Sequence, residues 1–491
     1  MESGRWKVKS RINILVVLMV CAVHVAAQDL QILSQTDLLG TARYVSMAGA
    51  MTAVGGDPSA VKDNPAALGV YRRLEVTLTL GEEMDRAYQR ETPTRTGQAN
   101  MFTATQAAFV YSYLNPYSSG LVANNFIISY NRLASYNRQY SAGYRGELGS
   151  LCDVAALKTW GLPETAVQSE DRWNDKEVGW LSCQAYDTYL INPDPQEEGM
   201  WYSILDPGQT VTTHLNMTET GYVNQYSLGW GANFRDRLYW GVTLNMVSLY
   251  HSQTADYYES FGDSCTLSNT TYVAHNGYGI NAAFGILAHP VRWLRVGASF
   301  TTPSATTVTT TSYGDMGSTL YATDSLGNVM LMGFKSASPT NRVTDRSFTM
   351  PLRVSAGVAF QLTNIGLVSF QYDYAHRKSI YDTHAFRAGL EGVIVNRFFL
   401  NAGYAYETTF ATPKAETLAY NTVRTDAYSQ FRNWSHYITA GFGYRASHVF
   451  VNAAYRLRIQ QFDTFAHELA TAYDMRAMTH NIVVTIGFHT K

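Results

Sequence analysis

The carboxyl-terminal part of the chain alternates apolar and polar residues in a series of short segments. The segment 365–375 places a set of apolar and aromatic residues on one face: Val368, Phe370, Tyr372 and Tyr374. The segments 400–406 and 449–459 repeat the pattern. Side chains point to opposite faces at successive residues of a strand, so each segment has one apolar and one polar surface. Continued through most of a long chain, this pattern predicts a barrel with an apolar exterior and a polar lumen.

The amino terminus reads as a signal peptide over residues 1–27. Basic residues precede a short apolar core over 12–23, and small residues at 25–27 fit a cleavage site. An amino-terminal membrane anchor is one alternative, but the apolar run is shorter than the ~20 residues that a spanning helix needs. A lipoprotein signal ending at Cys21 is another, although Val20 is a poor residue before a lipid-modified cysteine.

Composition agrees with an all-β membrane protein. The chain has 34 Tyr and 37 Gly, only 15% of its residues are charged, and its formal net charge is −2. Tyrosine is enriched at membrane–water boundaries, and glycine lets strands bend and approach closely. Later segments lack an apolar stretch of spanning-helix length, which argues against an inner-membrane helical protein. The charge balance gives no reason to expect nucleic acid as a partner.

The alternation predicts an all-β fold: a transmembrane antiparallel up-and-down β-barrel of about fourteen strands, each near the ~10 residues that cross a bilayer at a tilt. The expected strands are 74–83, 102–113, 124–134, 222–234, 237–250, 275–287, 292–302, 348–361, 365–375, 382–394, 397–408, 435–446, 448–459 and 478–489.

The connections support a barrel independently. Tight turns are expected at 235–237, 289–291, 363–364, 395–396 and 446–447. Long segments alternate with them, the largest being 135–221, and 376–381 is the one compact member of the long set. Barrels in bacterial outer membranes have short periplasmic turns and long outer loops. A soluble all-β sandwich remains the alternative, and it gives no reason for this alternation.

The segment 28–73 reads as a small hatch ahead of the barrel, which is assigned to 74–491. Small residues dominate it, and such residues suit short helices and turns in which backbones pack closely. The residues that define it are Gly49, Ala50, Gly56, Asp57, Asn64, Pro65 and Ala66. Placed before the first strand, this segment is expected to enter the lumen from the periplasmic side and to fill it.

On these residues the chain resembles the FadL/TodX-like outer-membrane transporters of long-chain fatty acids and other hydrophobic compounds. The small-residue run with Gly49-Ala50 and Gly56-Asp57, followed by Asn64-Pro65-Ala66, carries the resemblance, and the strand count extends it over the mature chain. Asn131-Arg132, 136–138 and 179–181 resemble a Bacteroidetes-type branch, some of whose members are labelled hemin receptors.

The resemblance implies a fourteen-stranded barrel, plugged by the hatch, that captures an apolar ligand outside and releases it sideways through a gap in the wall. A lateral exit into the bilayer spares an apolar ligand the periplasmic water. A break after the third strand, near Leu133–Tyr136, is the place expected for the gap.

The predicted inward face carries a set of charged residues: Arg353, Asp373, Arg387, Glu391, Glu407, Arg456 and Arg458. A polar lumen needs such a lining, so one interpretation is a network in which these charges pair with one another and with the hatch. The other is an anion anchor in which Arg353, Arg387, Arg456 or Arg458 holds a ligand carboxylate, for which the guanidinium fork is well shaped.

The segment 135–221 concentrates aromatic residues, namely Trp160, Trp173, Trp180, Trp201, Tyr186, Tyr189 and Tyr202. A loop that packs on itself is one interpretation, and a hydrophobic capture groove containing Trp180 and Trp201 is the other. Cys152, Cys183 and Cys265 follow the signal, with no metal-ligand spacing. A Cys152–Cys183 bridge and free thiols both remain open.

The expected function is a passive outer-membrane channel that takes up a hydrophobic small molecule, with outer-membrane lipid and lipopolysaccharide as surroundings. No nucleophile elbow, P-loop or metalloprotease motif occurs, so no enzyme, cofactor or metal site is expected. A barrel for protein secretion or partner binding is the main alternative. Haem acquisition is a second one, although the scattered histidines give no axial-ligand pair.

Overall fold

The computed structural model describes residues 33, 36–90, 95–115, 120–175, 177–262, 264–323, 329–362, 365–377, 381–395, 397–411, 428–467 and 469–490. The expected signal peptide, the turn at 363–364 and most of the segment 409–434 lie outside these residues.

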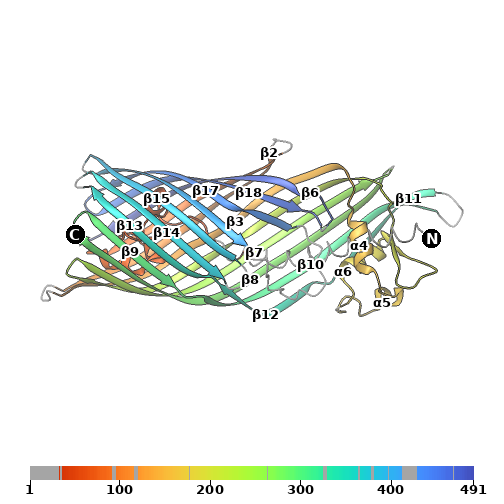
Figure 1. Cartoon of the computed structure of the whole chain (residues 1–491), viewed down its shortest axis with the longest axis horizontal. Coiled ribbons are helices and arrows are strands. Elements are labelled where there is room, and N and C mark those ends of the chain that lie inside the picture. The colour runs from red at the N-terminus through yellow and green to blue at the C-terminus, as the bar shows by residue number, and fades with distance from the viewer. Residues whose placement is uncertain are drawn as a thin grey trace, which may run out of the picture.

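The chain forms a closed antiparallel barrel of 14 strands, which confirms the predicted fold class (Figure 1). Its strands are β1 (Glu75–Gln89), β2 (Arg95–Leu114), β3 (Leu121–Glu147), β6 (Val211–Phe234), β7 (Leu238–Phe261), β8 (Cys265–Val291), β9 (Leu294–Thr301), β10 (Ser304–Thr323), β11 (Val329–Ala337), β12 (Asn341–Met350), β13 (Leu352–Leu362), β14 (Gly366–Arg377), β15 (Tyr381–Val395), β16 (Phe398–Ala411), β17 (Tyr428–Arg445), β18 (Val449–Phe465) and β19 (Tyr473–His489). Two of the 14 barrel strands are interrupted and carry more than one label: β9 and β10 make up one, and β11, β12 and β13 make up the next. Pairing of β1 with β19 closes the barrel.

Several strands are much longer than the sequence predicted. Strands β3 and β8 have 27 residues each, and β6 and β7 have 24. Much of the expected outer loops is therefore strand, and the turn expected at 289–291 lies after Val291, where β8 ends.

The sense of the alternation reverses along these long strands, which explains the difference. In the inner half of β6, Tyr226 and Leu228 face outward and are exposed. In its outer half, Leu215 and Met217 face inward and are buried, while polar residues face outward. A strand that leaves the bilayer exchanges lipid for water on its outer face, so its apolar residues move to the inside.

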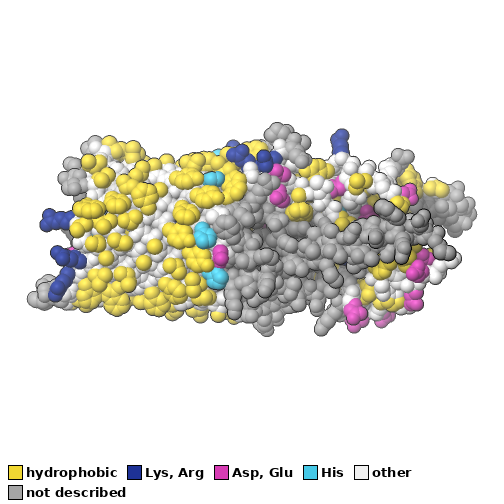
Figure 2. Space-filling view, in the orientation of Figure 1, with side chains coloured by type: hydrophobic (Ala, Val, Ile, Leu, Met, Phe, Trp, Pro, Cys, Tyr) yellow, Lys and Arg dark blue, Asp and Glu magenta, His cyan; other side chains and the backbone are white. Residues whose placement is uncertain are grey.

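The exterior shows where the bilayer contacts the barrel. Figure 2 shows apolar side chains covering the end of the barrel where the chain's carboxyl terminus lies, and few charges there except at the rim. At the opposite end the described surface is mixed, with acidic and other polar side chains among scattered apolar ones. The apolar band covers the inner halves of the strands, as expected for a membrane-spanning barrel.

The hatch lies inside the barrel, near its periplasmic end (Figure 1). It contains α2 (Ala42–Ser46), α3 (Ala60–Asp63) and the 3-10 helix η1 (Pro65–Val70). The Thr41 hydroxyl caps α2 by accepting the Tyr44 N–H, and the Asn64 side chain caps η1. Pro65 suits the first position of η1 because that position needs no N–H donor.

A folded cap covers the outer end of the barrel. It consists of α4 (Leu151–Thr159), α5 (Glu164–Gln168), α6 (Trp180–Asp187) and the hairpin of β4 (Ile191–Pro193) and β5 (Trp201–Ser203). Among the described residues, no helix is long and apolar enough to cross a bilayer.

Candidate functional site

Asn64 joins the hatch to the barrel wall. Its side-chain oxygen accepts the Ala66 N–H at 3.0 Å, and its amide nitrogen donates to Thr52 O at 2.8 Å and to Ile286 O of β8 at 3.2 Å. Asp57 organises the start of the hatch, because it accepts the Thr41 hydroxyl and the Ser59 N–H. Asn64-Pro65-Ala66 therefore has a structural role: it fixes the fold of the hatch and attaches the hatch to β8.

The wall contacts the hatch through inward-facing glycines. They lie on eight strands, one on each: Gly231, Gly241, Gly285, Gly297, Gly357, Gly389, Gly403 and Gly441. A Cβ at Gly285 would lie 1.9 Å from Asn64 Oδ1, and one at Gly403 would lie 2.6 Å from Ala48 N. Side chains at Gly285 and Gly403 would push the hatch away, so the glycines permit backbone to pack on backbone.

Ion pairs hold the hatch from two sides. Arg43 of α2 forms a two-pronged pair with Glu391, with distances of 2.6 and 2.9 Å. Arg387 lies 2.9 Å from Asp373 and 3.8 Å from Asp63 of the hatch, and it donates to the Tyr44 hydroxyl at 3.0 Å. Bidentate pairs between arginine and carboxylate fix geometry as well as charge.

Asp37, ahead of the first helix of the hatch, is the centre of a buried charge cluster. Its carboxylate pairs with Arg456 and lies 3.4 Å from Arg458, and Arg456 also pairs with Glu83 at 3.2 Å. The Arg456 side chain is fully buried. The sequence placed these arginines inside the barrel, but the partner Asp37 was missed; an acidic residue within the lumenal segment is the signal that points to it.

Arg353 differs from the other three candidate arginines. Among the described residues it makes no hydrogen bond or ion pair, and its side chain lines a cavity of about 110 Å³ on the outer side of the hatch. Besides Arg353, its charged lining residues are Asp37, Lys62, Asp63, Asp373, Arg387 and Glu407. Its apolar lining includes Leu133, Val223, Val247 and Met350. The cavity therefore offers an apolar surface beside a cation.

The barrel wall changes its pairing next to this cavity. The ladder between β2 and β3 runs from Leu114–Ala123 to Gln106–Asn131 and stops there, although both strands continue. A bulge in the β3–β6 pairing follows between Arg132 and Ala134. Leu133 in this bulge lines the cavity, and its carbonyl accepts the Asp37 N–H at 2.6 Å. We call this place the β2–β3 seam.

Tyr130 bridges the β2–β3 seam at its start. Its hydroxyl lies 3.3 Å from Ala104 O of β2 and 3.0 Å from Asn224 Oδ1 of β6. Beyond it, β3 packs against β18 and β19 through side chains: the Tyr140 and Phe462 rings are 5.3 Å apart, and Tyr144 stacks on Tyr473 at 5.1 Å. Farther out β2 and β3 approach each other again without a ladder, since a Cβ at Gly97 of β2 would lie 1.7 Å from Gln139 O of β3.

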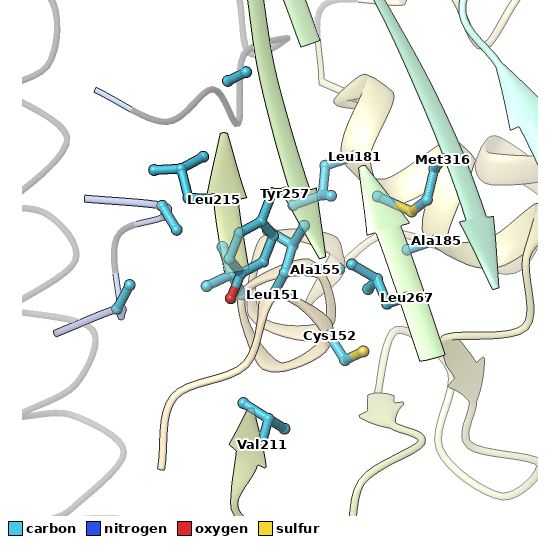
Figure 3. Close-up of a cluster of buried hydrophobic side chains, with 14 of the residues drawn as sticks. Leu151, Cys152, Ala155, Leu181, Ala185, Val211, Leu215, Tyr257, Leu267 and Met316 are labelled. Carbon is cyan, nitrogen blue, oxygen red and sulfur yellow. The ribbon is translucent and has the colours of Figure 1, made fainter. Parts of the chain in front are cut away.

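The aromatic residues of the cap pack into its own core. Trp180 and Trp201 are 4% and 3% exposed, and their indole N–H groups donate to Trp173 O and Leu162 O. Neither side chain therefore lines an open groove, in contrast to the groove interpretation. Figure 3 shows this core, in which Leu151 and Leu181 of the cap lie among inward-facing residues of β6, β7 and β8, such as Tyr257.

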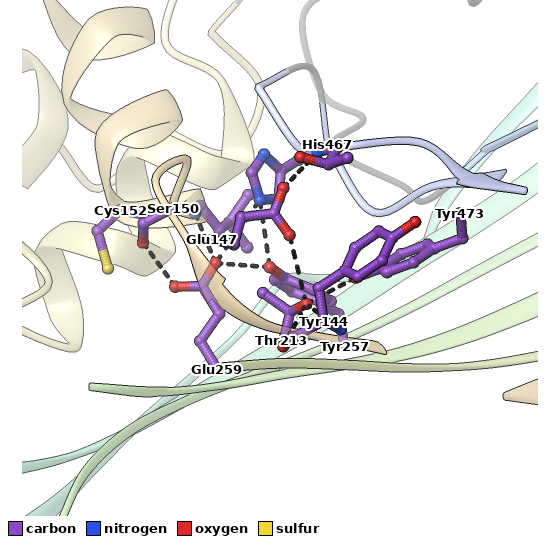
Figure 4. A network of polar contacts seen from close by, with 11 residues as sticks. Tyr144, Glu147, Ser150, Cys152, Thr213, Tyr257, Glu259, His467 and Tyr473 are labelled. Carbon is purple, nitrogen blue, oxygen red and sulfur yellow. Dashed lines mark hydrogen bonds and ion pairs between the residues drawn. The ribbon is translucent and has the colours of Figure 1, made fainter. Parts of the chain in front are cut away.

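A buried polar network joins the cap to the wall (Figure 4). Glu259 of β7 accepts the Ser150 hydroxyl at 2.5 Å, the Leu151 N–H at 2.7 Å and the Tyr257 hydroxyl at 2.7 Å. His467 lies 3.6 Å from the same carboxylate. A carboxylate at the start of α4 satisfies amide groups that lack partners in the helix, so Glu259 anchors the cap.

Cys152, Cys183 and Cys265 are free thiols in the structure, so the possible Cys152–Cys183 bridge is not formed. Burial raises the pKa of Cys152 far above its usual value, and it raises the pKa of Cys183 to about 12. Thiolate is the reactive form.

We expect a maleimide at pH 7 to leave Cys152 and Cys183 of the folded barrel unmodified, and to label them after denaturation. Mass spectrometry of tryptic peptides measures this, and rapid native labelling of either would show that the cap opens.

A second cavity, of about 520 Å³, lies at the periplasmic end below the hatch. Its lining is rich in arginine and includes Arg43, Arg295 and Arg445, beside Asp57 and Glu391. The described residues contain no group of three or more side chains suited to hold a metal ion.

Solved structures share this fold. A FadL homologue from Pseudomonas aeruginosa is 12% identical, with a TM-score of 0.50, and the match covers 93% of this chain and 99% of that one. The Pseudomonas putida toluene transporter TodX is also 12% identical, with a TM-score of 0.50 and coverage of 92% and 99%. No family model matches the sequence, and no curated protein matches it. At this identity the likeness establishes the fold, so the barrel part of the resemblance is confirmed; the Bacteroidetes branch and the hemin-receptor label stay predictions.

Proposed function

We propose that this barrel carries hydrophobic small molecules passively across an outer membrane. One observation carries the proposal: the cavity beside Leu133 lies where the hatch, the lumenal charge cluster and the interrupted β2–β3 seam meet. A ligand that leaves this cavity through the seam would pass directly into the bilayer. The fold shared with a toluene transporter and a FadL homologue supports the same use.

A lateral route is favoured physically because contact with water is unfavourable for an apolar ligand. Apolar surface is stable in lipid and unfavourable in periplasmic water, so a sideways exit lowers the barrier to release. Beyond the Gln106–Asn131 pair, β2 and β3 form no ladder with each other among the described residues, so the wall would part there with fewer backbone hydrogen bonds to break. The β2–β3 seam begins at Asn131, two residues before the region expected for the gap, and Tyr130 is its proposed latch.

Cavity size and lining bear on the ligand. About 110 Å³ is close to the ~150 Å³ of an engineered apolar cavity that binds benzene. A single-ring hydrocarbon therefore fits with little change, whereas a long-chain fatty acid requires the hatch or cap to move. Arg353 adds a cation that would hold a carboxylate. We therefore extend the proposal to both classes, with Arg353 contributing only to acids.

Uptake by cells that lack their own channels of this kind tests the proposal. Cells expressing the barrel are expected to take up radiolabelled toluene and oleate faster than cells with an empty vector. Arg353→Gln is expected to lower oleate uptake and to leave toluene uptake unchanged, because only oleate carries a carboxylate. Surface display and heat-modifiable gel migration control for expression and folding. Equal uptake of both compounds with and without the barrel would reject the function.

The cap gives the protein-partner alternative its one supporting observation. It closes the outer end with a packed core, and it exposes the aromatic side chains Trp160, Tyr189 and Tyr202. Affinity purification from a native envelope tests this alternative. A secreted protein recovered with the wild type and lost with Trp160→Ser and Tyr202→Ser would favour partner binding over transport.

The lumen gives haem no comparable support. His251 and His275 are neighbours on one wall, with stacked rings 6.0 Å apart, so they do not face each other across a space.

A further inference from the structure

Three tyrosine–histidine pairs repeat on the outward face of the barrel. In each, a tyrosine hydroxyl lies 2.7 Å from the Nδ1 atom of a histidine on the neighbouring strand. The pairs are Tyr372–His384, Tyr404–His436 and Tyr455–His480. They use the same register, because each tyrosine faces the residue two positions after its histidine: Phe386, Ile438 and Ile482.

These pairs mark the outer edge of the membrane-facing band. Figure 2 shows histidines along the border where the apolar surface ends, with basic side chains beyond it. Tyrosine and histidine each combine an apolar ring with a polar tip, which suits the headgroup level of a bilayer. The histidines therefore give the depth at which lipid headgroups contact the barrel.

Two arginines face outward just beyond this level on β1 and β19. Arg86 is opposite Met478 in the ladder, and Arg476 is opposite Tyr88, while His480 is opposite Met84. Alternation places all of these side chains on the same outward face, with Gln98 of β2 opposite Arg86. The cluster of Arg86, Arg476 and His480 thus spans two strands at headgroup depth.

Neither arginine of this cluster has an acceptor among the described residues. The Nε atom of Arg86 is buried and makes no hydrogen bond, and Arg476 forms no ion pair there. Arg90, farther out, is different because it pairs with Asp474 at 2.8 Å. A buried donor without an acceptor is unfavourable, so a bound anion would stabilise Arg86.

We propose that Arg86, Arg476 and His480 bind the phosphate group of a phosphorylated glycolipid in the outer leaflet. The guanidinium fork matches phosphate geometry, and two such groups at headgroup depth complement its charge. Tyr88 and Gln98 supply neutral donors and acceptors suited to sugar hydroxyls. The outward carboxylate of β1, Glu82, lies at the level of Ile482, on the membrane side of the cluster. Asp474 of β19, two residues from Arg476 on the same face, is paired with Arg90 at 2.8 Å.

The test compares lipid binding to the full-length barrel in detergent by native mass spectrometry, with bisphosphorylated lipid A as the probe. Arg86→Gln/Arg476→Gln is expected to bind it about tenfold or more weakly than wild type, since hydrogen bonds to charged groups are the strong ones. The matched control is Arg235→Gln/Arg237→Gln, which removes the same charge at the periplasmic turn and is expected to bind like wild type. Heat-modifiable gel migration verifies folding. If the double variant does not fold, the single variant Arg476→Gln, at an exposed residue, takes its place.

Further arms separate the sources of phosphate. Lipid A stripped of phosphate is expected to bind wild type and double variant equally weakly, and inorganic phosphate is not expected to compete at millimolar concentration. Binding of bisphosphorylated lipid A that is unchanged in the double variant would overturn the proposal. Equal affinity for phosphatidylglycerol would overturn its glycolipid part, because the site would then recognise phosphate alone.

Discussion

Oxidation of a Thr52→Cys/Gly357→Cys variant is expected to stop uptake of hydrophobic ligands, and reduction is expected to restore it. Thr52 is a fully buried residue of the hatch, and Gly357 faces it from β13. A Cβ at Gly357 would lie 3.3 Å from the Thr52 Cβ, close to the ~3.5–4.5 Å found in disulfides. The bond would fix the hatch to the wall.

The expected loss follows from how the hatch is packed. It contacts the wall backbone to backbone through glycines, and Asn64 and Arg43 add bonds to β8 and β15. Cores packed this closely rearrange between discrete states. If the passage of a ligand requires displacement of the hatch, a single covalent link should reduce uptake to the level of cells that lack the barrel.

Initial rates of toluene and oleate uptake, before and after a reductant, measure the effect. Each single cysteine variant is the control for the substitutions themselves, and quantified crosslinking shows what fraction of the barrels is locked. Full uptake by a completely crosslinked population would show that ligands pass without hatch movement. In that case any lateral exit would depend only on opening of the β2–β3 seam.

The inner half of the barrel was predictable because lipid imposes a simple alternation. Phe370 and Tyr372 face outward as expected, and residues such as Gln371 face the lumen, where Gln371 accepts two hatch amides. The outer halves of β6 and β7 were missed because their alternation has the opposite sense there. A search for an inversion of the apolar face within one strand would have found where they leave the membrane.

The candidate site was predictable only in part, since pairing depends on contacts between distant segments. Arg387, Arg456 and Arg458 lie in the lumen as the alternation predicted. Their partners Asp63 and Asp37 come from the hatch, and no local pattern pairs them. Trp180 and Trp201 are buried because the cap folds into a core, and composition does not distinguish such a core from an exposed groove.

Substitution of Arg456 by methionine is expected to destabilise the barrel by about 3–5 kcal/mol, the cost of removing one partner from a buried ion pair. Asp37 and Glu83 are at most 9% exposed; Glu83 would lose its guanidinium partner, and Asp37 would keep only Arg458, 3.4 Å away. The same change should loosen the start of the hatch, since Asp37 also donates its N–H to Leu133 at the β2–β3 seam.

Urea unfolding in detergent, followed by tryptophan fluorescence and heat-modifiable migration, measures the free energy of unfolding. Arg458→Met is the matched control: its guanidinium lies 3.4 Å from Asp37 and is partly exposed, so its loss should cost less. Adding Asp37→Asn and Glu83→Gln to Arg456→Met should recover much of the stability, because neutral amides are cheaper to bury than unpaired carboxylates. If the triple variant is no more stable than Arg456→Met alone, packing of the arginine stem, and not charge, stabilises this part of the lumen.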